Sequence, residues 1–314
     1  MRLIVHGLND GVDASEWMTK MKNRLLNVDA DSNVVLVDWS RGAAINLLSD
    51  LRFASVRMVG QHLVTLVQNL QHLYPRNFAP EDVHVIAHSF GTFAADVLGR
   101  NVPGIGRISG LDPGGVANHD QLPANMRLDA SDARFVDVIH TDSAVPRELP
   151  PPPAGGAPLI QVSPLVRVPA AHQGSDLLLG HRDFFPNGGY AQPGCSTSRD
   201  SLLAPLRPLL NEPLKRLLSC NHFRAVDLYM ESIRAHSQQS SCNLLAYKCS
   251  NYTDFLDGRC AVCSGEGANC APLGFYADFG HSLDARERGD KYYVTTNPRT
   301  PFCREYNTSL PLTS

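Results

Sequence analysis

The chain has 314 residues, of which 43% are hydrophobic and 19% are charged, and its net charge is −3. This length can bury a sizeable core in one large domain or two small ones. The nearly neutral charge leaves no basic surface of the kind that binds nucleic acid, so no nucleic-acid partner is expected. No apolar run approaches the ~20 residues that span a membrane.

The first half of the chain alternates between strand-like and helix-like patterns. Short apolar runs predict strands, and apolar residues at helical spacing predict helices. The predicted strands are 3–5, 34–37, 83–87, 105–111 and 135–139, and the predicted helices between them are 14–26, 51–74 and 90–99. This alternation is typical of an α/β fold, with a mostly parallel sheet and helices on both faces.

The middle of the chain is rich in proline. Eight prolines lie between Pro146 and Pro169, four of them consecutive at 150–153. Because proline lacks a backbone donor and has a fixed φ, this stretch cannot form a central strand or a helix. We expect residues 143–180 to form a long Pro-rich loop, either extended or disordered.

All the cysteines lie after residue 194. They are Cys195, Cys220, Cys242, Cys249, Cys260, Cys263, Cys270 and Cys303. An even number of cysteines gathered in one region favours disulfides and an oxidising compartment. The C-x-x-C spacing at 260–263 could also serve a zinc site, but a second pair of that spacing is missing. Sequons at Asn251 and Asn307 fit a secreted protein.

The N-terminus does not resemble a secretion signal. Residues 1–7 have the pattern of a strand that runs into a turn, without a cationic start or a cleavage site. Since the cysteines and sequons favour an extracellular protein, we expect the N-terminus to be incomplete in this sequence.

A serine stands between a predicted strand and a predicted helix at 83–91. Ala87 and Gly91 are the small residues on either side of Ser89, where a G-x-S-x-G nucleophile elbow has two glycines. Such a turn lifts the hydroxyl to the carboxyl edge of the sheet, where N–H groups of the helix N-terminus face an oxyanion. A serine that only caps the helix is the alternative.

A nucleophilic serine needs a histidine base and an acid that orients the histidine. Asp112 follows the next predicted strand, which brings it to the same sheet edge, although an aspartate before Pro113 is also common in turns. The chain has twelve histidines that compete for the base role. His222 lies beside Cys220 and before a helical pattern at 225–233, where a structural histidine is the commoner interpretation.

Together these residues resemble the pancreatic-lipase family of secreted lipases and phospholipases. The matching segments occur in the family's order over nearly the whole chain: VHG at 5–7, VDW at 37–39, HSFG at 88–91, ISGLDP at 108–113, RLDASD at 127–132, FVDVIHTD at 135–142, DFFPNGG at 183–189, PGC at 193–195 and CNH at 220–222. The resemblance implies an α/β-hydrolase fold, here N-terminally incomplete, with Ser89, Asp112 and His222 as catalytic triad.

The resemblance also implies roles for residues around the triad. The backbone N–H groups of Leu8 and Phe90 would form the oxyanion hole, and Phe90 is bulkier near the acyl site than the leucine usual in the family. No cofactor is expected for catalysis. A structural Ca²⁺ would be held by backbone carbonyls and by carboxylates, a set of hard oxygen ligands that suits this ion. These ligands are Ala124, Arg127, Asp129 and Asp132.

The disulfide pairing implied by the resemblance is Cys195–Cys220, Cys249–Cys260, Cys263–Cys270 and Cys242–Cys303. The last pair is similar to one in the phosphatidic-acid-selective phospholipase A1 branch. Residues 1–303 would form the catalytic domain, with a lid at 196–219. A tail at 304–314 would follow, without the C-terminal β-sandwich domain of the family's larger lipases.

The predicted lid has leucines at helical spacing between 202 and 218, interrupted by three prolines. Such a segment can cover an apolar cleft and turn toward lipid at an interface, although it could also be an ordinary core-facing helix. Its length favours a triglyceride substrate, whereas the cysteine pattern of the tail favours a phospholipid. We predict a secreted triacylglycerol lipase-like ester hydrolase that acts at a lipid interface. The alternatives are a phospholipase A1 that cleaves the sn-1 ester and a non-catalytic lipid-binding or yolk-type homologue.

Overall fold

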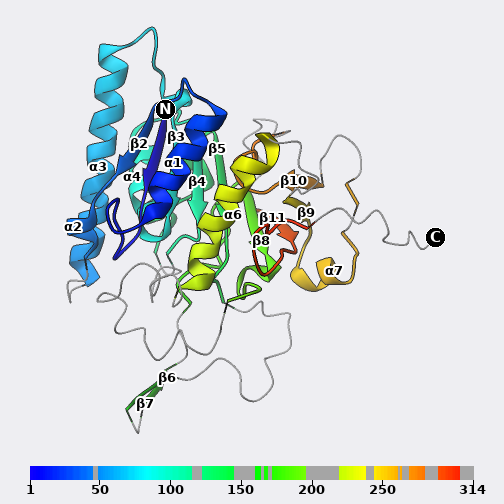
Figure 1. The fold of residues 1–314 in the computed structure, drawn as a ribbon. Helices are drawn as coiled ribbons and strands as arrows, with labels where there is room; N and C mark the ends of the chain where they lie inside the picture. The colour runs from blue at the N-terminus through cyan, green and yellow to red at the C-terminus, as the bar shows by residue number, and fades with distance from the viewer. Residues whose placement is uncertain are drawn as a thin grey trace.

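The structure is a computed structural model that describes residues 1–44, 49–114, 122–144, 160–163, 166–168, 172–195, 219–237, 244–260, 262–263, 269–279 and 289–304. Its centre is a nine-stranded sheet of order β10-β9-β11-β8-β5-β4-β3-β1-β2 (Figure 1). The strands are β1 Arg2–Val5, β2 Val34–Val37, β3 His84–His88, β4 Arg107–Leu111, β5 Phe135–Ile139, β8 Arg182–Pro186, β9 Leu245–Lys248, β10 Cys270–Pro272 and β11 Asp290–Val294.

Most of this sheet is parallel. Every neighbouring pair from β2 to β11 is parallel, and at the far edge β9 is antiparallel to both of its neighbours, β11 and β10. The carboxyl ends of the parallel strands therefore meet at one edge, where residues that follow different strands can converge.

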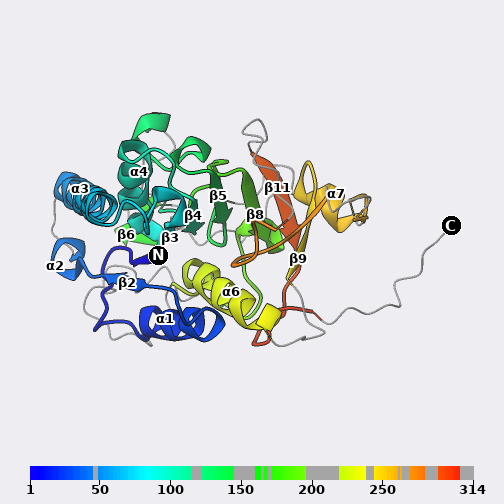
Figure 2. The ribbon, with the colours of Figure 1, turned by 90° about the horizontal axis from the view of Figure 1, so that it is seen from above.

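Helices cover both faces of the sheet. Their bounds are α1 Glu16–Val28, α2 Ser40–Ala43, α3 Ser49–Leu73, α4 Thr92–Asn101, α6 Cys220–Ser237 and α7 Tyr252–Leu256. Short 3₁₀ turns are η1 Pro80–Asp82, η2 Ser89–Gly91, η4 Ala124–Met126, η5 Ala130–Asp132 and η6 Asn187–Gly189. Seen from above, α1 and α6 lie on one side of the sheet and α3 and α4 on the other (Figure 2). Among the described residues, no helix is both long enough and apolar enough to cross a membrane.

Each face of the sheet has its own hydrophobic core. On one face Trp17 and Leu25 of α1 pack with Val226 of α6, and on the other Val67 of α3 packs with Phe93 of α4. The predicted α/β class, with a mostly parallel central sheet and helices on both faces, is confirmed.

The observed elements differ from the predicted ones in three places. The helix expected from residue 90 begins as the tight turn η2 and becomes α-helical at Thr92. The strands β8, β9, β10 and β11 were not predicted as a continuation of the sheet. Within the Pro-rich loop, β6 (Ile160–Ser163) and β7 (Val166–Val168) pair as a separate two-stranded sheet. Residues 196–218 of the predicted lid and residues 305–314 of the tail lie outside the described residues.

Candidate active site

Ser89 lies in a sharp turn at the carboxyl end of β3. Its φ is 54°, in the left-handed region that non-glycine residues rarely adopt, and the chain turns directly into η2 and then α4. Gly91 lies so close to β1 that a Cβ there would be 2.7 Å from the carbonyl oxygen of His6. The small residue predicted after the serine is therefore required by close packing, and the turn leaves the Ser89 side chain partly exposed.

The backbone that follows β1 lies directly against this serine. A Cβ on Gly7 would be 2.7 Å from the Ser89 Cβ, which brings the next residue, Leu8, to the same sheet edge. The indole N–H of Trp39 donates to the His6 carbonyl over 2.7 Å, and the Trp39 backbone N–H donates to His6 Nε2 over 3.0 Å. These contacts fix the peptide units just before Leu8.

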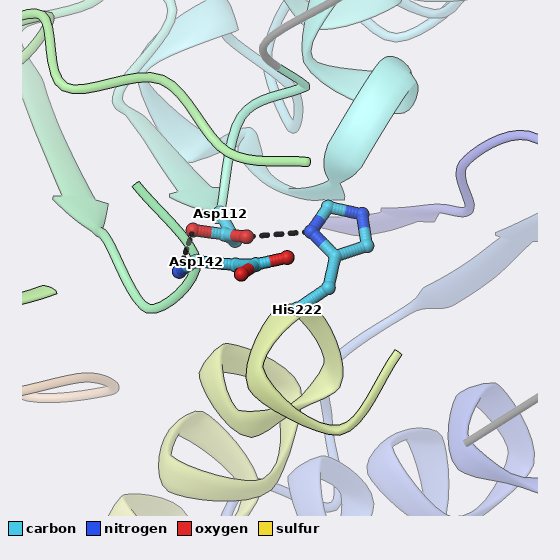
Figure 3. Close-up of side chains that lie close together, drawn as sticks. All are labelled: Asp112, Asp142 and His222. Carbon is cyan, nitrogen blue, oxygen red and sulfur yellow. Dashed lines mark hydrogen bonds and ion pairs between the residues drawn. The ribbon is translucent and has the colours of Figure 1, made fainter. Parts of the chain in front are cut away.

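Asp112 follows β4 and is held on both carboxylate oxygens. Its Oδ1 accepts from the backbone N–H groups of Thr141, at 2.7 Å, and Asp142, at 3.1 Å. Its Oδ2 is 2.5 Å from Nδ1 of His222, which lies in the first turn of α6 (Figure 3). Both side chains are buried, at 0% and 5% exposure, so the carboxylate orients the imidazole away from bulk water.

The Ser89 hydroxyl is not hydrogen-bonded to His222 in the described part of the chain, although both residues lie at the carboxyl edge of the sheet. Contacts between nucleophile and base are often loose until substrate binds, so this geometry does not argue against a catalytic pair.

A second carboxylate, Asp142, lies beside this pair. Ligand atoms of Asp112, Asp142 and His222 all fall within 4.8 Å of one another, close enough to hold a cation, and this is the only such group among the described residues (Figure 3). His222 Nδ1 faces Asp112 at hydrogen-bond distance, which fits a shared proton, and calcium prefers an all-oxygen shell. The arrangement therefore suits an acid–base pair better than a calcium site.

The residue that precedes Thr141 and Asp142 is also fixed by hydrogen bonds. His140 at the end of β5 is fully buried, with Nε2 2.9 Å from Asp183 Oδ1 and Nδ1 2.7 Å from the Ser175 carbonyl oxygen. Gly174 leaves room for the acid, since a Cβ there would be 2.4 Å from Asp112 Oδ1. Sequence reasoning placed Gly174 in the Pro-rich loop and gave it no role.

The aromatic residues around Ser89 separate into two groups. The Phe90 ring is 2% exposed and packs with Phe53 and Phe93 on the α3/α4 face. The Phe90 side chain, expected to be bulky near the acyl site, thus packs into the core on this face of the sheet. On the other face His88 lies 4.6 Å from the His222 ring, measured between ring centroids.

The predicted calcium ligands lie around η4 and η5. Asp132 Oδ2 accepts from the Asp129 backbone N–H at 2.8 Å, while Arg100 donates to the Ala124 carbonyl at 2.9 Å and to Asp96 at 2.6 Å. Burial raises the pKa of Asp132 to about 7, and nearby Asp96 and Asp129 add to the effect. The three carboxylates of Asp96, Asp129 and Asp132 have two arginines near them, Arg57 and Arg100, and their oxygen atoms are a donor set that fits a divalent cation. Arg127, whose carbonyl is the fourth predicted ligand, lies directly after η4, and its side-chain Nε donates to the Leu122 carbonyl at 3.3 Å.

Three of the predicted cysteine pairs are bonded: Cys195–Cys220, Cys249–Cys260 and Cys263–Cys270. These bonds overturn the zinc alternative, since all four thiolates near 260–263 are used. Cys303 is also disulfide-bonded, and Cys242 lies outside the described residues. Asn251 caps α7 by accepting from the Asp254 backbone N–H, and Asn307 lies outside the described residues.

Comparison with known proteins finds a lipase family model and several lipase-related proteins. The sequence profile of the family named "Lipase" matches residues 1–149 and 166–302. Human inactive pancreatic lipase-related protein 1 is 34% identical over 312 residues, which are 99% of this chain and 59% of that protein. Human pancreatic lipase-related protein 2 is 35% identical over 278 residues, covering 88% and 52% of the two chains.

A third relative is the pancreatic triacylglycerol lipase of Ictidomys tridecemlineatus. It is 33% identical over 313 residues, covering 99% of this chain and 59% of its own length. The chain therefore spans between half and three-fifths of the relatives that it matches. One of these relatives is named inactive, so similarity alone does not decide whether this chain is an enzyme.

Proposed function

The chain belongs to the lipase family that includes the pancreatic lipases, and from that premise we propose that it is a secreted serine ester hydrolase acting on lipids. The observation that carries the proposal is the Asp112–His222 pair. One oxygen of the acid orients the imidazole at 2.5 Å, while two backbone N–H groups hold the other oxygen. The buried His140–Asp183 pair is held in a similar way, but both ring nitrogens of His140 are hydrogen-bonded, whereas the described residues provide a partner only for Nδ1 of His222.

The proposed reaction uses groups at the carboxyl edge of the sheet. The Ser89 hydroxyl attacks the ester carbonyl while His222 takes its proton, and Asp112 stabilises the imidazolium that forms. The backbone N–H groups of Leu8 and Phe90 receive the oxyanion. His222 then gives the proton to the departing alcohol, and water hydrolyses the acyl-serine by the same steps.

We assign the remaining features as follows. Calcium would be held by Asp129 and Asp132 with the carbonyls of Ala124 and Arg127, and it would tie η4 to η5 without taking part in the reaction. The disulfides fit an extracellular location. A triacylglycerol lipase-like activity is proposed, because one similar protein is named a pancreatic triacylglycerol lipase and the predicted lid is long.

Covalent labelling tests the function directly. Wild-type protein should be labelled at Ser89 by an alkylphosphonate and should hydrolyse a soluble short-chain ester. Ser89→Ala should lose labelling and at least about 10³-fold in rate, since the oxyanion hole alone supplies little of the catalysis. Ser232→Ala is the matched control, because Ser232 is buried in α6 and bonds only backbone groups of Tyr229 and Phe275.

Two outcomes would contradict the proposal. Labelling of the Ser89→Ala variant would move the nucleophile elsewhere. A folded wild-type protein that is neither labelled nor active would favour the non-catalytic lipid-binding alternative, in keeping with the relative named inactive. Assays with emulsified triglyceride and with phospholipid vesicles then separate the two substrate classes, and sn-1 cleavage of phospholipid alone would favour the phospholipase A1 alternative.

A further inference from the structure

A buried glutamine contacts both the loop that holds the acid of the proposed triad and the residue that precedes the base. Gln192 is 4% exposed and belongs to the turn that links β8 to Cys195. Its side-chain N–H group donates to the carbonyl oxygens of Thr141, at 3.1 Å, and Pro186, at 3.0 Å. Sequence reasoning gave this residue no role, although it stands directly before the matched segment at 193–195.

The first of these bonds acts on the peptide unit that holds the acid. The Thr141–Asp142 peptide donates its N–H to Asp112 Oδ1 and accepts from Gln192 at its carbonyl oxygen. A donor on the carbonyl fixes the plane of the peptide and polarises it, which strengthens the N–H as a donor. Gln192 therefore bears on the orientation of Asp112 without touching it.

The backbone of the same residue reaches the base. The Gln192 N–H donates to Asn221 Oδ1 over 2.9 Å, and Asn221 directly precedes His222 in α6. The Gln192 carbonyl accepts from the Cys195 N–H, and Cys195 is bonded to Cys220 in the same helical turn. Two short paths thus join this turn to the start of the helix that carries the imidazole.

The amide of Gln192 is itself oriented by its neighbours. Its Oε1 accepts from Asn187 Nδ2 at 2.9 Å, and Asn187 is locked by Thr296 on both its amide nitrogen and its oxygen. Since each polar atom in this chain of contacts has a partner, the amide can point only one way, with its N–H group toward Thr141.

We infer that Gln192 is a positioning residue that couples the acid-holding loop after β5 to the base-bearing helix α6. This inference rests on the proposed function, because the role has meaning only if Asp112 and His222 act on a substrate.

Two substitutions separate positioning from mere stability. Gln192→Met keeps the size but removes the donors, and Gln192→Glu keeps the shape but places a carboxylate against two carbonyl oxygens. For Gln192→Met, kcat per phosphonate-titrated active site should fall between about 10- and 100-fold at unchanged KM, as expected for a small misplacement of catalytic groups. The deficit should not depend on pH.

Gln192→Glu provides a readout that a structural role would not move. A protonated glutamic acid regains one O–H donor, so the ratio of wild-type to variant phosphonylation rate should shrink as the pH falls. Ser232→Ala is the control, since it removes buried hydrogen bonds far from the site. It should lower the melting temperature and leave kcat per active site unchanged.

The inference is overturned if folded Gln192 variants keep the wild-type kcat per active site, or if their loss matches only the fraction unfolded. If neither variant folds, Asn221→Ala takes their place, because it cuts the link to α6 at a partly exposed side chain. In that variant an unchanged kcat overturns the coupling, and a fall of several-fold supports it. A wild-type protein that is not labelled at all overturns the proposed function instead, so the two failures are distinguishable.

Discussion

Residues in the left-handed region gather at the candidate site. Among the described residues, the non-glycine residues with positive φ are Asn9, Ser89, Asp112 and Asn187, and they follow β1, β3, β4 and β8 at the same sheet edge. Such conformations cost on the order of 1–3 kcal/mol each and persist only where surrounding contacts impose them. The sequence indicated turns after residue 7, at Ser89 and before Pro113, but it did not indicate the left-handed φ of Asn9, Asp112 and Asn187, which depends on contacts between distant segments.

Gly174 makes the clearest prediction about a single residue. Gly174→Ala would place a Cβ 2.4 Å from Asp112 Oδ1 and 2.7 Å from Oδ2. The Asp112 carboxylate would have to move away from the His222 ring, so the rate of ester hydrolysis per folded molecule should fall by about 10²-fold. Overpacking should also lower the free energy of unfolding by about 1–3 kcal/mol.

Gly60→Ala is the control for this change, because its Cβ would lie 2.5 Å from Val97 Cβ, between α3 and α4 and away from the triad. Denaturant titration and ester hydrolysis should show loss of stability without loss of rate. Wild-type activity in folded Gly174→Ala would show that the backbone around residue 174 moves and that the Asp112 carboxylate keeps its position.

At the scale of elements, the sequence predicted the strands and helices that have a local apolar pattern. The strands β1 to β5 and their helices follow from apolar runs and helical periodicity, which depend on neighbours in the chain. The continuation through β8 and β11 did not follow, because Arg182–Pro186 and Asp290–Val294 carry charged and aromatic residues whose partners lie far away. His222 also has its partner, Asp112, far away in the chain, so only the family resemblance distinguishes it among the twelve histidines.

The predicted lid can be tested as an element. Replacing residues 196–219 by a short polar loop should spare hydrolysis of soluble esters, because Ser89, Asp112 and His222 all lie outside it. Hydrolysis of emulsified lipid should fall by about tenfold or more, since the leucines would no longer contact the interface. The control is a segment of the native length in which the leucines are kept and only polar residues are changed. Equal loss on soluble and emulsified substrates would identify the segment as structural.

At the scale of the molecule, two disulfides add to the apolar packing at one edge of the sheet. One apolar cluster extends to Ala246 of β9 and Ala271 of β10, and the bonds Cys249–Cys260 and Cys263–Cys270 flank these antiparallel strands. These strands are short and form the edge of the sheet, so cross-links that restrict the unfolded chain contribute there. The even number of the cysteines and their clustering predicted disulfides, but they could not show that two of the bonds stabilise this edge.

The pH dependence of folding should reveal the buried acidic cluster. The pKa of Asp132 is raised to about 7 in the folded protein from 3.8, mainly by burial. The folded state therefore binds more protons than the unfolded state between about pH 4 and 7, and the contribution of Asp132 to stability falls as the pH rises through this window. Asp132→Asn stays neutral, so in EDTA it should be more stable than wild type above pH 7, by on the order of 2 kcal/mol, and nearly equal to it at pH 4.

Calcium should reverse that difference if Asp132 is one of its ligands. At pH 8, added Ca²⁺ would favour the ionised carboxylate and raise the melting temperature of the wild type, because a ligand that binds only the folded state stabilises it. Asp132→Asn should show no such rise. Melting curves of both proteins at pH 5 and pH 8, each with Ca²⁺ and with EDTA, provide the measurement. A variant that is less stable than wild type at pH 8 in EDTA would mean that the contact with Arg100, at 3.5 Å, outweighs the cost of burying the charge.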